Sequence, residues 1–225
     1  MFIPIFNGNN DLTSKPKINS FIDWYTKGDI WHKQDPGSGN LGYGWVHYSL
    51  IRLTKPDNVL CIGSKYGFIP AVCALACRDN KKGMVDFVDA GFDMEDWDKK
   101  ADIHWGGVGF WKKCDSNKYF GKFGLQDYIS LIVMKSSQYK ALNMNKKYGY
   151  VHIDGDHSYK GVKTDFEMFW PGLDRGGFLA LHDIGSSDKF GLKYGTRKFW
   201  KEITKKYQVA LQFVEDPGLG IIQKI

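Results

Sequence analysis

The segment NVLCIGSKYGFIPAVCALACR, residues 58–78, constrains the fold more than any other part of the chain. Its first six residues form a short apolar run that ends at a glycine, which is typical of a buried strand. The residues from Pro70 onward have helical composition, so a strand, a glycine turn and a helix follow one another. This order is the opening unit of nucleotide-binding α/β folds.

Strand-like and helical segments alternate along the rest of the chain. Further strands are predicted at residues 84–90 (MVDFVDA), 128–134 (YISLIVM), 148–156 (YGYVHIDGD) and 178–184 (FLALHDI). Helices are predicted at residues 44–54, 70–78, 116–123, 162–173 and 194–207. Such alternation predicts a parallel sheet with right-handed crossovers and with helices on both faces.

The C-terminal end departs from this alternation. VALQFVED and GLGIIQKI are joined by Pro217 and Gly218, a turn signal that leaves no room for a helix. The last strand is therefore expected to run antiparallel to its neighbour. We predict one α/β domain over residues 1–225, a Rossmann-like fold whose seven-stranded, mostly parallel sheet ends in an antiparallel hairpin. This ending favours a methyltransferase over a dehydrogenase.

Composition limits the kind of protein. A chain of 225 residues, 43% hydrophobic and 16% aromatic, can bury one sizeable core. The longest apolar runs are shorter than a membrane span, and the start MFIPIFNGNNDL lacks a basic and then apolar leader, so a cytoplasmic location is expected. The net charge of +6 is spread along the chain and decides nothing by itself. Because the sequence shows neither a concentrated basic stripe nor an extra binding module, a small-molecule partner is expected and nucleic acid is not. A homo-oligomer is compatible with all of this.

Two segments lie outside the regular pattern. A short N-terminal arm, rich in Asn, Lys, Pro and Ser, covers about the first 20 residues. A long insertion at about 90–116 exceeds an ordinary strand-to-helix loop. Its aromatic residues predict a functional lid or binding loop, and they are Trp97, Trp105, Phe110 and Trp111.

The glycine turn and the end of the second strand form a candidate cofactor site. Gly63 and Gly67 bracket a turn where a ligand can approach the backbone closely, and the first amides of the next helix can accept an anion. Asp89 ends the second strand about 20 residues later, where an acid can accept hydrogen bonds from ribose hydroxyls.

Ionisable residues follow the fourth and fifth strands. Asp154, Asp156 and His157 follow the fourth, and His182 and Asp183 follow the fifth. Because these strand ends meet at one edge of the sheet, we expect the five side chains to converge. Gathered carboxylates favour a bound divalent metal. The imidazole of His182 suits zinc, iron or manganese better than magnesium.

One more histidine lies inside the predicted fourth strand. His152 is expected to be a hydrogen-bonded core residue and not a ligand.

The motifs VLCIGSKYG and VDFVD resemble those of the class I S-adenosylmethionine-dependent methyltransferases, although Cys61 stands where that family commonly has an acid. The resemblance implies S-adenosylmethionine as cofactor and methyl transfer as reaction. The cofactor contacts that it implies are Gly63, Ser64, Tyr66 and Gly67 at the methionine end, Asp89 at the ribose, and Ser136 and Ser137 at the adenine.

The C-terminal half resembles a subgroup with cephalosporin hydroxylase-like proteins and metal-dependent O-methyltransferases of macrolide sugars. Its pattern implies that Asp154, His182 and Asp183 hold magnesium or another divalent ion and that His157 is the catalytic base. Asp154 and His182 are also implied in catalysis, His182 as a substrate contact or second base. The acceptor would be a small-molecule hydroxyl on a sugar, polyketide or phenol.

Three other interpretations stay open from the sequence. An RNA methyltransferase would explain the positive charge. A catalytically silent binding protein could keep the same fold. An iron-dependent oxygenase could use His157, His182 and Asp183 as two histidines and one carboxylate.

Overall fold

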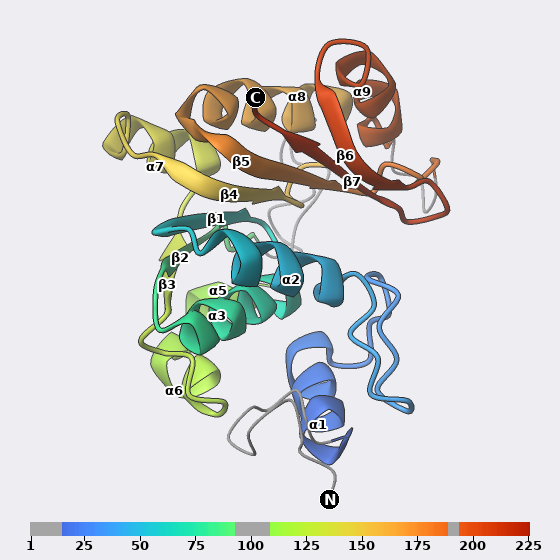
Figure 1. The fold of residues 1–225 in the computed structure, drawn as a ribbon. Helices are drawn as coiled ribbons and strands as arrows, with labels where there is room; N and C mark the ends of the chain where they lie inside the picture. Colours follow the sequence, from blue (N-terminus) through green and yellow to red (C-terminus); the bar gives the residue numbers. More distant parts are fainter. Residues whose placement is uncertain (1–14, 93–108, 189–193) are drawn as a thin grey trace, which may run out of the picture.

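The computed structural model describes residues 15–92, 109–188 and 194–225. A single twisted sheet lies between two layers of helices (Figure 1). Its strands are β1 Asn58–Ile62, β2 Met84–Asp89, β3 Ile129–Val133, β4 Tyr148–Ile153, β5 Leu173–His182, β6 Gln208–Phe213 and β7 Leu219–Gln223.

The strand order is β3-β2-β1-β4-β5-β7-β6. The first five strands pair in parallel, with Cys61 of β1 opposite His152 of β4. β7 lies between β5 and β6 and is antiparallel to both. The predicted seven-stranded sheet with its C-terminal antiparallel hairpin is confirmed.

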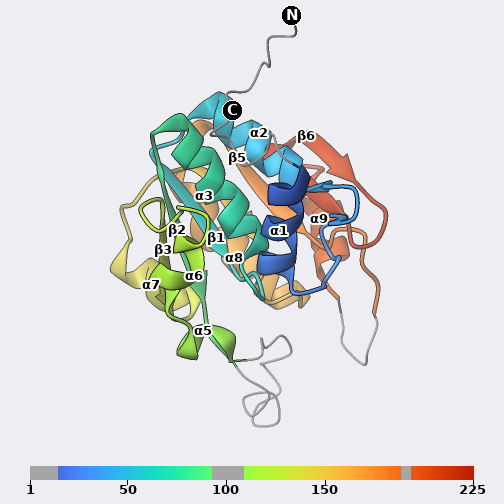
Figure 2. The same ribbon diagram turned by 90° about the horizontal axis from the view of Figure 1, so that it is seen from below.

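Each face of the sheet has its own helices and its own apolar core (Figure 2). One face carries α1 Lys15–Thr26, α2 Gly44–Thr54, α3 Phe68–Asn80, α5 Phe110–Lys113 and α6 Ser116–Gly121. The other carries α7 Ser136–Leu142, α8 Tyr159–Phe169, the 3-10 turn Trp170–Gly172 and α9 Thr196–Ile203. The prediction of helices on both faces is confirmed, whereas α7 was not expected from the sequence.

The helix α1, which overlaps the end of the predicted N-terminal arm, packs into the core. Phe21 and Tyr25 of α1 are almost fully buried, with ring centroids 4.8 Å apart. Tyr25 stacks on Phe120 of α6 at 5.7 Å, and Phe21 lies 5.2 Å from the ring of Phe123. These contacts make α1 part of the core, and the predicted arm over about the first 20 residues stays a prediction, because residues 1–14 lie outside the described ranges.

The insertion predicted at about 90–116 is only partly described, because residues 93–108, and with them Trp97 and Trp105, lie outside the described ranges. Trp111 is 3% exposed and stacks on Phe120 at 5.9 Å, with Phe87 of β2 at 4.8 Å. Trp111 is therefore a core residue, and the prediction that the insertion is a functional lid or binding loop stays a prediction. Among the described residues, no helix combines the length and apolar surface that crossing a bilayer requires.

The burial of α1 leads to a stability prediction. Phe21→Ala should lower the free energy of unfolding by about 3–5 kcal/mol, because it removes a buried ring among other rings. Urea unfolding followed by circular dichroism measures this loss. Ser20→Ala, on the exposed side of the same helix, should stay within about 0.5 kcal/mol of the parent protein. Equal stability of the two variants would show that α1 is not part of the cooperative fold.

Candidate active site

The turn after β1 touches the loop after β4. Gly63 has φ +68°, and a β-carbon there would lie 2.3 Å from the backbone oxygen of Asp154. The Asp154 amide donates to the carbonyl of Ile62 at 2.8 Å. The predicted cofactor turn and the predicted acidic loop therefore meet at one edge of the sheet.

The second glycine of the turn precedes α3. Gly67 has φ +84°, and a β-carbon there would lie 3.0 Å from the ring of Trp111. Close packing by the protein itself thus explains why both positions are occupied by glycine. Between them, Ser64 is buried and Tyr66 is half-buried, with the Tyr66 ring 5.6 Å from Phe110.

Asp89 ends β2 beside this turn. Its carboxylate accepts a hydrogen bond from the Gly91 amide at 2.7 Å and another from the Ser64 amide. Burial raises the pKa of Asp89, although the two amides oppose that shift. The structure therefore places Asp89 against the glycine turn, as the sequence predicted.

The two serines predicted to contact adenine lie at the start of α7. The Ser136 hydroxyl donates to Asp165 of α8 at 2.6 Å, and burial raises the pKa of Asp165 to about 6. Ser137 is exposed. Ser136 thus has a structural partner on a neighbouring helix, and its predicted contact with adenine stays a prediction.

Two carboxylates and two imidazoles converge where β4 and β5 end. Asp154 Oδ1 lies 3.1 Å from His182 Nδ1 and 3.3 Å from His157 Nε2. Asp183 Oδ2 lies 3.0 Å from His157 Nδ1 and 3.2 Å from His182 Nδ1. The structure thus brings together four of the five ionisable residues that the sequence placed at this edge.

The charges of this cluster balance one another. Burial alone would raise the pKa of Asp154, but His182 and His157 outweigh it and hold that pKa well below its ordinary value. Burial would lower the pKa of both imidazoles, and the carboxylates of Asp154 and Asp183 raise it instead. The two buried carboxylates thus favour the protonated forms of the two imidazoles that they face.

The backbone of Asp183 is held in an unusual conformation. Its φ is +59°, in the left-handed region that aspartate tolerates better than most residues. The Ser186 hydroxyl lies 2.7 Å from Asp183 Oδ1 and 2.7 Å from Asp216 Oδ1. The Gly185 amide donates to the Pro217 carbonyl at 2.8 Å. The turn between β6 and β7 therefore fixes the loop that carries Asp183.

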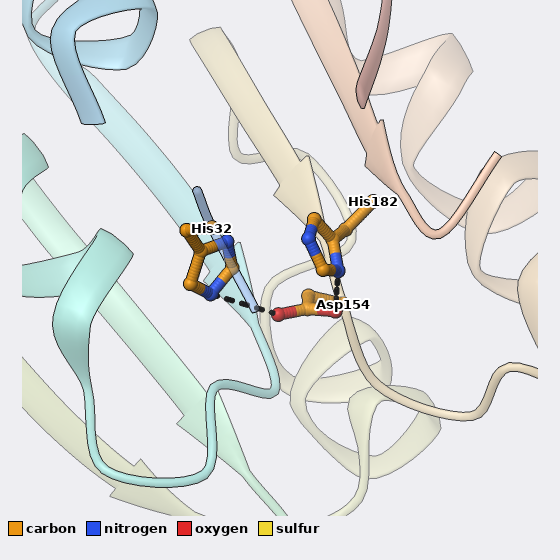
Figure 3. A group of neighbouring side chains, drawn as sticks. All are labelled: His32, Asp154 and His182. Atoms are coloured by element: carbon orange, nitrogen blue, oxygen red, sulfur yellow. Dashed lines mark ion pairs between the residues drawn. The ribbon is translucent and has the colours of Figure 1, made fainter. Parts of the chain in front are cut away.

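A third imidazole, which the sequence interpretation missed, comes from the segment between α1 and α2. The His32 ring is 4.4 Å from that of His182, and His32 Nε2 is 3.8 Å from Asp154 Oδ2 (Figure 3). Burial and the neighbouring His182 lower the pKa of His32 to about 3. The preceding carbonyl, of Trp31, lies 3.0 Å from His182 Nε2.

The remaining two predicted residues behave differently from expectation. Asp156 does not join the cluster; its Oδ1 accepts a hydrogen bond from the Ser158 amide at the start of α8. His152 is fully buried as expected, but neither ring nitrogen has a hydrogen-bond partner within the described ranges. Its nearest described ring is His47 of α2, at 4.7 Å.

The donor atoms allow a test of which ion the cluster suits. One ligand atom each from His32, Asp154 and His182 lies within 4.8 Å of the others, and the same holds for Asp154, His157 and Asp183. Magnesium needs an octahedron of oxygen atoms. Here the imidazole nitrogen of His182 stands between the two carboxylates, so magnesium fits this set poorly.

The fold is the Rossmann-like fold of class I methyltransferases that the sequence predicted. Residues 60–184 match the methyltransferase domain family. The chain belongs to this family.

Comparison with curated proteins adds a distant relative. The uncharacterized protein y4gI of Sinorhizobium fredii is 24% identical over 196 residues, which cover 85% of this chain. The matched segment spans only 20% of that relative's own length.

Solved structures of methyltransferases share the fold over most of this chain. An O-methyltransferase of Bacillus cereus in complex with SAH has a TM-score of 0.58 and 15% identity, covering 99% of this chain and 94% of its own. TomG of Streptomyces achromogenes is an O-methyltransferase of tomaymycin synthesis, solved in complex with SAM. It has a TM-score of 0.56 and 12% identity, covering 98% of this chain and 92% of its own. SAH-bound PaMTH1 of Podospora anserina has a TM-score of 0.59 and 14% identity, covering 100% of this chain and 99% of its own.

The contact between the glycine turn and the acidic loop can be tested with two glycine variants. Gly63→Ala and Gly176→Ala both place alanine at positive φ, but only the first meets backbone atoms, since a β-carbon at Gly176 has nothing within 4 Å. Gly63→Ala should therefore cost about 1–3 kcal/mol more in free energy of unfolding, the usual range for overpacking. Chemical denaturation of both variants measures the difference, and equal losses would contradict the close approach.

Proposed function

We propose that this chain transfers the methyl group of S-adenosylmethionine to a hydroxyl oxygen of a small molecule. The observation that carries the proposal is the contact of Gly63 with Asp154, because it joins the turn that resembles the cofactor motif to the loop of the acid and base groups. A methyl donor at the first and a proton acceptor at the second would face each other across this one edge of the sheet.

The residues at the glycine turn support the cofactor assignment. Asp89 accepts one hydrogen bond from the turn, through the Ser64 amide, and ends the strand next to it, where a ribose would present its hydroxyls. The comparison structures from B. cereus and S. achromogenes, which share the fold, hold SAH and SAM. S-adenosylmethionine supplies an electrophilic methyl group on a sulfonium.

His157 is the base in this proposal. Its side chain is 18% exposed, whereas that of His182 is 3% exposed and already lies against a backbone carbonyl. Asp154 and Asp183 face its two ring nitrogens and orient the ring. In its neutral form, the imidazole of His157 takes the proton of the acceptor hydroxyl, whose oxygen forms the new bond to carbon while the carbon–sulfur electron pair stays on sulfur. Alignment of the three atoms supplies much of the rate.

The acceptor class follows from the surroundings of this base. The Tyr194 ring centroid lies 5.6 Å from that of His157 and forms an aromatic side of the site. An aromatic wall next to ionisable groups suits a ring that carries hydroxyls, such as a sugar or a phenol. A cytoplasmic location belongs to the same proposal.

Asp89 gives the first test of the cofactor. Asp89→Ala should weaken binding of S-adenosylhomocysteine about tenfold or more, because hydrogen bonds from a ligand to a charged group contribute roughly 1.5–3 kcal/mol. Isothermal titration calorimetry measures the affinity. Asp174→Ala, in an exposed position at the opposite end of the sheet, should bind like the parent protein. Failure of the parent protein to bind S-adenosylhomocysteine would reject the proposed function.

His157 gives the test of the chemistry. His157→Gln should lower methyl transfer by about 10²–10⁴-fold, the usual contribution of a general base, and leave S-adenosylhomocysteine binding nearly unchanged. The assay follows transfer of a labelled methyl group from S-adenosylmethionine to a panel of phenols and sugars.

The matched control for this test is Thr164→Ala, an exposed position of α8 with no part in the site. It should retain full activity on any acceptor that the parent protein methylates. A His157→Gln protein that methylates as fast as this control would remove His157 from the mechanism.

A further inference from the structure

We propose that His32, Asp154 and His182 bind one first-row transition-metal ion of the zinc or cobalt kind, with the N-terminal segment supplying the third ligand. The inference goes beyond the proposed function, whose proton transfer needs no metal. It also differs from the magnesium set implied by the sequence, which drew its ligands from the strands alone. Figure 3 shows the three side chains turned toward one another from separate elements.

The distances suit a common ion. Ligand atoms bonded to one zinc ion lie about 2.0–2.2 Å from it, so two of them are at most about 4.4 Å apart. Asp154 Oδ1 lies 3.1 Å from His182 Nδ1, and Asp154 Oδ2 lies 3.8 Å from His32 Nε2. The whole set of donor atoms lies within 4.8 Å, so a movement of a few tenths of an ångström closes it around an ion.

The second ring nitrogen of His182 is already fixed. Nε2 lies 3.0 Å from the carbonyl oxygen of Trp31, which can only accept, so Nε2 carries a hydrogen. Nδ1 is then the nitrogen that can present a lone pair toward Asp154. A histidine whose other N–H donates to a backbone carbonyl is the usual arrangement around a metal ligand.

His32 has no other role that the structure accounts for. The residue is 8% exposed, and its Nδ1 has no hydrogen-bond partner among the described residues. Its Nε2 faces Asp154 Oδ2 at 3.8 Å, beyond hydrogen-bond distance. A buried polar group without a partner is costly. An ion between Nε2 and the carboxylate would join these two groups, whereas Nδ1 would still have no hydrogen-bond partner among the described residues.

The segment that carries His32 is rigidly placed. The Tyr43 amide donates to the His32 carbonyl at 2.7 Å, and the His32 amide donates to the Gln34 side chain at 2.8 Å. At Gly42, φ +55°, a β-carbon would lie 2.1 Å from the same carbonyl. The imidazole is therefore held at the cluster by its own loop and does not depend on a ligand to bring it there.

The donor chemistry selects the ion. Two imidazole nitrogens and one carboxylate suit zinc, cobalt, iron or nickel, whereas magnesium prefers oxygen. Three protein ligands are also the number that leaves a coordination position open. The competing arrangement is the metal-free one, in which protonated His157 and His182 neutralise Asp154 and Asp183.

Metal titration of the purified full chain tests the inference. After treatment with a chelator, the protein should bind one equivalent of Zn²⁺ by calorimetry and one of Co²⁺, whose visible absorption reports nitrogen ligation. Millimolar Mg²⁺ should not displace either ion. Absence of binding, or displacement by Mg²⁺, overturns the inference in favour of the metal-free ion pairs.

Variants show whether His32 is a ligand. His32→Ala should weaken Zn²⁺ binding at least tenfold and change the Co²⁺ spectrum, whereas Lys33→Ala, the exposed neighbour, should change neither. His32→Gln repeats the test with a larger side chain, and circular dichroism confirms that each variant is folded. Zn²⁺ affinity unchanged in folded His32→Ala or His32→Gln overturns the assignment.

The same samples separate this inference from the proposed function. Protein that binds S-adenosylhomocysteine but no Zn²⁺ rejects the metal site and leaves the methyltransferase proposal standing. Protein that binds Zn²⁺ through His32 but no S-adenosylhomocysteine supports the metal site and rejects the proposed function.

Discussion

The structure around the site depends on keeping two buried carboxylates neutralised. A buried carboxylate without a partner is strongly destabilising, so Asp154 and Asp183 need positive charge within a few ångströms. Their partners at 3.0–3.3 Å are the imidazoles of His157, in the loop after β4, and of His182, the last residue of β5, whose pKa the carboxylates raise. Because parallel strands end at the same edge, the sheet brings these loops together without further restraint.

The cluster also depends on a segment far from it in the sequence. Lys27, at the end of α1, holds its ammonium 5.0 Å from the Trp24 ring and 5.4 Å from that of Tyr119. This contact and the buried rings of α1 fix where the chain leaves the helix. Trp31 and His32 follow within five residues, so packing on one face of the sheet determines which groups reach its edge.

The parts that sequence predicted correctly are those with a local pattern. Strand and helix alternation gave the sheet, and strand ends placed Asp154 and Asp183 together. His32 has no motif around it, and the long-range contacts of its loop and of the preceding helix α1 bring it to the site. Trp111 looked like a lid residue because it lies in a long glycine-rich segment, but the ring of Phe120 covers it. Such long-range contacts leave no periodic signal in the sequence.

The position of β7 has a consequence for biosynthesis. On the ribosome β6 emerges before β7, yet it can join the sheet only through β7. Until then β5 is an open edge, a state prone to pairing with other chains. Leu219 and Ile221 belong to the core on one face of the sheet and Ile222 to the core on the other. A nascent chain that stalls before this strand would leave both cores incomplete and open to chaperones and proteases.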